Sequence, residues 1–212
     1  MQTLLFLHGW GGDENSFIHI TPSLSKFFNC VSISMPMDTP DKPWTLEDYA
    51  NFVFEFLGDE KQIHLIAHSF GARVAIVMET MRPGTFSRML LTGAAGIPRR
   101  RNLWRWLKIH LHKMRIWKSK GSAEYRILSP NGKRTFQNII KHDLRPLIKK
   151  IHIPTLLVYG SKDTATPIYI AKRWTRIAPN ARLRIYKGVG HFCFIENPAR
   201  FVSDALEWLK ED

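Results

Sequence analysis

Short apolar segments recur along this chain, and segments with helical spacing separate them. Some carry apolar side chains at every position, as Leu4 to Leu7 do. Strands of this kind that alternate with helices are typical of a mostly parallel sheet with helices on both faces. The pattern therefore predicts an α/β fold of about six strands, at residues 3–7, 30–34, 63–67, 89–92, 155–159 and 183–186.

Helix signals lie between these predicted strands. Thr45 is suited to cap a helix that runs to about Leu57, and Asn197 with Pro198 is typical of the start of a last helix. Further helices are expected over residues 71–81 and 167–177.

The stretch 97–150 does not continue this alternation. It is longer than an ordinary connection between two elements, and it has helical patterning of its own. We therefore predict a helical cap, or lid, inserted after the fourth strand. The core would then consist of residues 1–96 and 151–212, with 97–150 as the cap.

Length and composition agree with one domain that carries an insertion. The chain has 212 residues, of which 44% are hydrophobic, and this excludes a disordered chain. Its two cysteines, Cys30 and Cys193, are too few for a disulfide scaffold, and we expect Cys193 to be a buried thiol. With no leader-like or membrane-spanning segment expected, the predicted location is cytoplasmic.

The motif that bears most directly on chemistry is Ala67-His68-Ser69-Phe70-Gly71. It lies where a predicted strand meets a predicted helix. A serine on such a sharp turn is held in a strained conformation with its hydroxyl exposed above the sheet. Small residues two positions before and after it let the strand and helix approach closely, and Ala67 stands where glycine is commoner.

A serine nucleophile needs a base, and the base needs an orienting acid. Asp163 follows the fifth predicted strand in Gly-Ser-Lys-Asp, and His191 follows the sixth in Gly-Val-Gly-His. Each candidate therefore lies after the carboxyl end of a strand, where open α/β sheets form their sites. An oxyanion would be bound by backbone N–H groups, from Phe70 at a helix start and from Trp10 in the loop His8–Gly12.

Four motifs follow one another along the chain: the His8–Gly12 loop, the turn around Ser69, Gly-Ser-Lys-Asp163 and Gly-Val-Gly-His191. In this order they resemble those of the α/β-hydrolase superfamily, and the resemblance covers essentially the whole chain except the cap. Within it, the chain is most similar to small carboxylesterases, which include the pimeloyl-acyl-carrier methyl esterases and related C–C bond hydrolases. The resemblance implies Ser69 as nucleophile, His191 as base and Asp163 as acid, with Trp10 and Phe70 as oxyanion donors. The family usually begins with a hairpin ahead of the His-Gly strand. Here the chain begins at that strand, so we expect a reduced sheet.

Other histidines have different expected roles. His8 is expected to support the oxyanion loop, and His68 to line the substrate pocket together with Trp104 and Leu107 of the cap. His110 and His112 are two positions apart, which directs them to different sides of a helix, so no metal is expected. No cofactor is expected either.

The charge of the chain is concentrated in one segment. The net charge is +13, and nine cations with no acid lie between Arg99 and Lys120. Three interpretations remain open: the segment covers the active site with its cations in solvent, binds an anionic membrane surface, or docks an acidic carrier protein. Nucleic acid is not expected, because no nucleic-acid-binding signature is present.

Together these features predict a serine hydrolase that cleaves carboxylic esters of acyl or aromatic substrates through an acyl-enzyme. A C–C bond hydrolase or a thioesterase of the same fold is an alternative. A second alternative, of a different class, is an inactive hydrolase-like protein that binds an acidic partner or an anionic membrane through its basic cap.

Overall fold

The six predicted strands form one parallel sheet. The computed structural model describes residues 1–39, 41–99 and 127–211. The strand order is β2-β1-β3-β4-β5-β6, and every neighbouring pair is parallel. The strands are β1 Thr3–Leu7, β2 Asn29–Ile33, β3 Ile63–His68, β4 Phe86–Thr92, β5 Thr155–Gly160 and β6 Ala181–Tyr186. Each lies within a few residues of its predicted position, so the fold prediction is confirmed.

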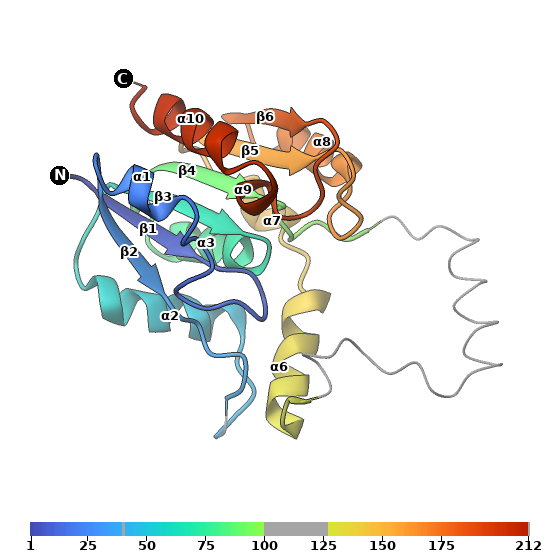
Figure 1. Ribbon diagram of the computed structural model, residues 1–212. Coiled ribbons are helices and arrows are strands. Elements are labelled where there is room, and N and C mark those ends of the chain that lie inside the picture. Colours follow the sequence, from blue (N-terminus) through green and yellow to red (C-terminus); the bar gives the residue numbers. More distant parts are fainter. Residues whose placement is uncertain (40, 100–126, 212) are drawn as a thin grey trace.

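Helices cover both faces of this sheet (Figure 1). The helices are α1 Thr21–Leu24, α2 Leu46–Leu57, α3 Phe70–Met81, α6 Pro130–Lys141, α7 Arg145–Ile148, α8 Ile168–Ile177, α9 Cys193–Glu196 and α10 Pro198–Leu209. One face packs against α2, α3, α7 and α8, and the other against α1, α9 and α10.

Alternation of side chains along the strands separates these two cores. In β1, Leu5 and Leu7 point into the core that contains α3, while Leu4 and Phe6 point into the core that contains α10. All four are at most 1% exposed. Apolar side chains at every position of a strand are therefore explained by burial on both faces, as the sequence predicted.

Local capping explains where the predicted helices begin. Thr45 accepts a hydrogen bond from the Asp48 backbone N–H, and the Asp48 carboxylate accepts one from the Thr45 N–H, which forms a capping box. Asn197 caps α10 through its side chain, with Pro198 in the first turn. Both predicted N-caps are confirmed.

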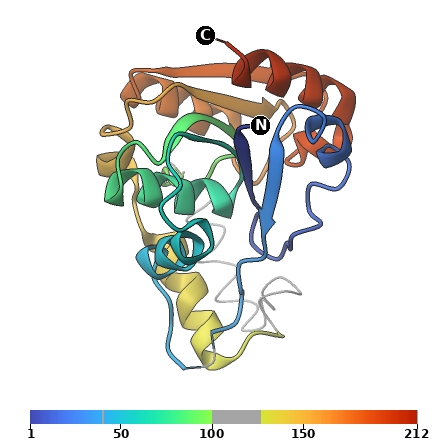
Figure 2. The ribbon, with the colours of Figure 1, turned by 90° about the vertical axis from the view of Figure 1, so that its left-hand side faces the viewer.

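The described part of the predicted cap contains two helices, α6 and α7. Helix α6 lies outside the two helical layers, beyond the carboxyl ends of the strands (Figure 2). Its Thr135 hydroxyl accepts a hydrogen bond from the Trp44 backbone N–H at 2.8 Å, and the Arg73 guanidinium donates to the Ile139 carbonyl at 2.9 Å. The limits of the cap remain a prediction.

Candidate active site

Ser69 is the single residue between β3 and α3. Its φ of 48° and ψ of −98° lie in a region that residues other than glycine seldom adopt. Two backbone hydrogen bonds hold it, from the Ser69 N–H to Thr92 O at 3.0 Å and from the Ala95 N–H to Ser69 O at 3.3 Å. A strained serine at the carboxyl end of a central strand is the geometry that the motif predicted.

Gly71 shows why this turn requires small residues. A Cβ atom on Gly71 would lie 2.2 Å from the Leu7 carbonyl oxygen and 2.8 Å from that of His8. The first turn of α3 therefore packs directly on the backbone at the end of β1. Any larger residue at position 71 would displace either the helix that follows Ser69 or the strand beside it.

Asp163 and His191 lie together, as their chain positions predicted. His191 Nδ1 is 2.7 Å from Asp163 Oδ2, and the Asp163 side chain is fully buried. Burial of Asp163 opposes ionisation. Hydrogen bonds from His191 and Thr166 outweigh this effect, so the pKa of the Asp163 carboxyl lies below its usual range. An ionised Asp163 keeps a proton on His191 Nδ1 and leaves Nε2 free to act as a base.

Thr166 belongs to the same cluster, and the sequence interpretation missed it. Its backbone N–H donates to Asp163 Oδ1 at 2.8 Å, and its hydroxyl donates to Asp163 Oδ2 at 2.7 Å. The threonine hydroxyl is also 3.4 Å from His191 Nδ1. The available signal was a threonine three residues after an aspartate, a spacing at which the aspartate accepts hydrogen bonds from the following turn.

His68 lies against His191, with ring centroids 4.6 Å apart. Its Nδ1 is 3.1 Å from the Thr92 carbonyl oxygen, which can only accept, so Nδ1 carries the proton. Burial, together with the charge of His191, lowers the pKa of His68 to about 3. His68 is therefore neutral and does not compete with His191 for a proton.

The loop after β1 approaches Ser69 closely. A Cβ atom on Gly9 would lie 2.7 Å from His68 Cδ2 and 3.6 Å from Ser69 Cβ. His8 supports this loop, as expected: its Nδ1 donates to Gly9 O at 2.7 Å, and its Nε2 accepts from the Met35 N–H at 2.8 Å. Burial lowers the pKa of His8, which favours the neutral form that these two bonds need.

Trp10 and Phe70 are neighbours across this loop. Their ring centroids are 5.3 Å apart, and the Trp10 ring also lies 5.1 Å from Phe136 of α6. Phe70 is the first residue of α3, where backbone N–H groups have no partner within the helix. Their role as oxyanion donors remains a prediction.

The loop after β1, the turn at Ser69 and the segment that begins at His191 line one cavity of about 270 Å³. Ser69, His68, His191 and Trp10 line it, whereas Asp163 lies behind His191 and does not. Residues that the sequence interpretation did not assign form an apolar wall: Phe192, Phe194 and Ile195. The signal for this wall was the apolar run directly after His191.

Several predictions lie outside the described residues. Trp104 and Leu107, expected in the pocket, are among them, as are His110, His112 and most of the basic segment. Cys193 is a buried free thiol, as predicted, and burial raises its pKa to about 11. Within residues 1–39, 41–99 and 127–211, no three His, Cys, Asp or Glu side chains gather into a possible metal site.

Comparison with known proteins assigns the chain to a family. The sequence model of the alpha/beta hydrolase family matches residues 4–205, and the chain belongs to this family. It is similar to the uncharacterized hydrolase YugF of Bacillus subtilis, at 24% identity over 99% of this chain and 90% of that one. It is also similar to the pimeloyl-[acyl-carrier protein] methyl ester esterase of Nitrosomonas europaea, at 24% identity over 96% and 94% of the two chains.

Solved structures share the fold. The serine hydrolase CarC, which is involved in carbazole degradation, superposes with a TM-score of 0.78 at 20% identity, over 99% of this chain and 91% of that chain. In the described part of the chain, no helix is long and apolar enough to cross a membrane.

Proposed function

We propose that this protein is a serine hydrolase that cleaves carboxylic esters through an acyl-enzyme. The observation that carries the proposal is the 2.7 Å contact between His191 Nδ1 and Asp163 Oδ2, because His191 lines the same cavity as the strained Ser69. Membership of the alpha/beta hydrolase family and the similarity to a methyl ester esterase support it.

In the proposed first step, Ser69 Oγ attacks the ester carbonyl carbon, and His191 Nε2 takes the hydroxyl proton. The tetrahedral intermediate collapses, the C–O bond of the ester breaks, and His191 returns the proton to the leaving alcohol. Asp163 stabilises the charged imidazole between these transfers. In the second step a water molecule, activated by His191 in the same way, attacks the acyl-enzyme and releases the acid.

Backbone amides would stabilise the negative oxygen of each tetrahedral intermediate. The N–H of Phe70 lies at the N-terminus of α3, where the helix dipole favours negative charge. The Trp10 N–H belongs to the loop that Gly9 brings against Ser69. Each such donor contributes roughly 3 kcal/mol to stabilisation of the transition state.

The lining of the cavity favours an uncharged, apolar acyl group. Trp10, Phe192, Phe194 and Ile195 line the same cavity as Ser69. Among the described lining residues there is no lysine, arginine, aspartate or glutamate. An acyl or aromatic group could therefore bury its surface there without meeting a charge.

Hydrolysis of a nitrophenyl ester series from acetyl to palmitoyl tests the proposal. We expect turnover that falls at least about 10³-fold in Ser69→Ala while the thermal unfolding midpoint stays close to that of the wild type. The acyl length with the highest kcat/KM would give the length of the pocket. Equal turnover by Ser69→Ala would refute the mechanism.

A fluorophosphonate probe gives a second, independent measurement, because it reacts only with an activated serine. We expect one adduct per chain, located on Ser69 by peptide mass spectrometry. A folded protein that neither hydrolyses any ester nor reacts with the probe would instead be a hydrolase-like binding protein. Labelling without ester turnover would favour C–C bond or thioester cleavage by the same serine.

A further inference from the structure

A second, larger cavity lies between α7 and α8, and none of its lining residues belongs to the Ser69 cavity. Its volume is about 570 Å³. Four cations line it, Arg145 and Lys149 at α7 and Arg173 and Arg176 on α8. One carboxylate, Asp143, is also present. A cavity with this lining can attract an anion by charge alone.

The Asp143 carboxylate already has a cationic partner, Arg145. Arg145 Nε lies 3.0 and 2.9 Å from the two Asp143 oxygens, its Nη2 lies 2.5 Å from Oδ2, and its backbone N–H also donates to Oδ1. These hydrogen bonds, and the charges of Arg145 and Arg173, hold the pKa of Asp143 below its usual range. Asp143 therefore stays ionised and balances one of the four positive charges.

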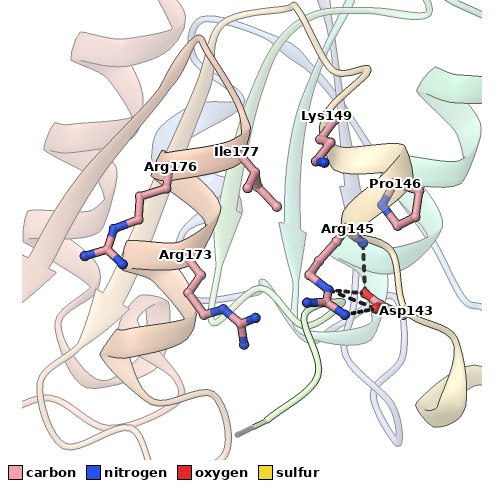
Figure 3. Close-up of a pocket in the computed structure, with 7 residues that line it drawn as sticks. All are labelled: Asp143, Arg145, Pro146, Lys149, Arg173, Arg176 and Ile177. Atoms are coloured by element: carbon pink, nitrogen blue, oxygen red, sulfur yellow. Dashed lines mark hydrogen bonds and ion pairs between the residues drawn. The ribbon is translucent and has the colours of Figure 1, made fainter.

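Three positive charges remain without a matching carboxylate. In the described part of the chain, no acidic side chain lies within ion-pair distance of Lys149, Arg173 or Arg176. The Arg173 guanidinium turns toward that of Arg145, whereas Arg176 turns away from it, and Lys149 lines the cavity from the end of α7 (Figure 3). Like charges that face one space repel each other, and an anion between them removes that repulsion.

Arg173 is held in place for such a role. Its Nη1 donates to the Pro98 carbonyl at 3.2 Å, and its side chain is partly buried. The neighbouring Trp174 is fully buried and fastens α8 to the core, as Ile148 fastens α7. The two helices therefore present their cations from a packed framework, which lowers the entropy cost of binding.

We propose that the cavity between α7 and α8 binds the phosphate group of a phosphate ester, with Lys149 and Arg173 as the principal contacts. A phosphate carries close to two negative charges at neutral pH and accepts several charge-assisted hydrogen bonds, and guanidinium and ammonium groups match both properties. The lining also includes two apolar side chains, Ile177 of α8 and Pro146 of α7. Either side chain can contact an uncharged portion of the ester.

Calorimetric titration with inorganic pyrophosphate at constant ionic strength tests the site. We expect saturable binding of one pyrophosphate per chain, weakened at least tenfold in Lys149→Gln and in Arg173→Gln. Lys150→Gln and Lys172→Gln are matched controls, because each residue is the exposed chain neighbour of the one it controls for and does not line the cavity. These controls should change the affinity less than twofold.

Lys149→Gln is the decisive variant, because Lys149 has no ion-pair partner among the described residues and its loss should leave folding unchanged. Equal weakening in Lys149→Gln and Lys150→Gln would show a general effect of net charge and would overturn the proposal. So would an absence of saturable binding up to about 10 mM.

The source of the phosphate can be distinguished with vesicles of phosphatidylcholine that contain phosphatidic acid. Displacement of vesicle-bound protein by pyrophosphate, lost in Lys149→Gln, would identify a lipid phosphate as the occupant. Pyrophosphate binding without any binding to these vesicles would identify a soluble phosphate ester. Either result retains the site.

Discussion

The cavity beside Ser69 and the cavity between α7 and α8 belong to the same strongly basic chain, but their linings differ. Backbone turns and rings such as those of Trp10 and Phe194 form the first, and no lysine, arginine or carboxylate is among its described lining residues. Cations such as Lys149 and Arg173 line the second, which is about twice as large.

The difference reflects where each cavity lies in the fold. The first lies at the carboxyl ends of parallel strands, where short loops bring backbone N–H groups and glycines together. A fixed negative charge there would repel the negative charge that develops on an oxyanion. The second lies between the surfaces of two helices. Lysine and arginine side chains there can pack their apolar stems on the protein and keep their charged ends in the cavity. The lining of the first cavity therefore fits the proposed reaction, and the lining of the second fits the proposed binding of an anion.

The variant with the largest expected effect at the first cavity is Asp163→Asn. An amide in place of the carboxylate no longer favours the proton on His191 Nδ1, so Nε2 is no longer a base. We expect kcat for a nitrophenyl ester to fall roughly 10⁴-fold, with KM little changed. Steady-state kinetics of the variant and the wild type provide the measurement. A loss of only a few-fold would mean that another acid orients His191.

Thr166→Val gives a smaller effect on the same cluster. It removes the hydroxyl that donates to Asp163 Oδ2 at 2.7 Å and keeps a similar volume. We expect kcat to fall roughly tenfold, as for the loss of one hydrogen bond to a charged group, and KM to change little. Thr166→Ser, which keeps the hydroxyl, should restore most of the rate. Equal losses in both variants would make Thr166 a packing residue instead.

The neutrality of the first cavity is tested through His68. Its pKa of about 3 in the folded state is below the ordinary histidine value of about 6.5. The unfolded chain therefore binds a proton first, so the stability from His68 is fully present above pH 6.5 and is lost as pH falls toward 3. We expect the NMR signals of the His68 ring to stay those of a neutral imidazole from pH 7.5 to 4.5. Protonation within that range would contradict the neutral lining.

The smallest expected effect tests whether the two cavities are independent. Lys149→Gln should weaken pyrophosphate binding. It should change kcat/KM for the best nitrophenyl ester less than twofold, because the two cavities have no lining residue in common. Parallel calorimetry and ester kinetics on one preparation provide the check. A loss of ester turnover that follows the loss of pyrophosphate affinity would show that the cavities are coupled.

Most of the fold could be predicted because its signals are local. An apolar run such as Leu4–Leu7 specifies a strand buried on both faces, and Thr45 specifies a helix start through its own hydrogen bond. The places of Ser69, Asp163 and His191 followed from the rule that sites of parallel sheets form after strand ends. Their proximity was predicted for this reason, while their catalytic roles remain a prediction.

Contacts between distant segments could not be predicted in the same way. No sequence pattern relates His68 to His191, or Trp10 to Phe136, since each pair meets across elements whose packing depends on the whole core. Nor does any local signal distinguish Lys149, which faces a cavity, from Lys150, which does not.

The sequence by itself therefore determined where the strands lie along the chain, the strained turn at Ser69 and the proximity of Asp163 to His191. The tertiary structure alone decided that His68 is neutral, that Thr166 joins the Asp163 hydrogen bonds, and that cations from α7 and α8 face one space. The physical reason is range. Apolar patterning and capping act within a few residues, whereas burial and the summed field of charges depend on segments that only folding brings together.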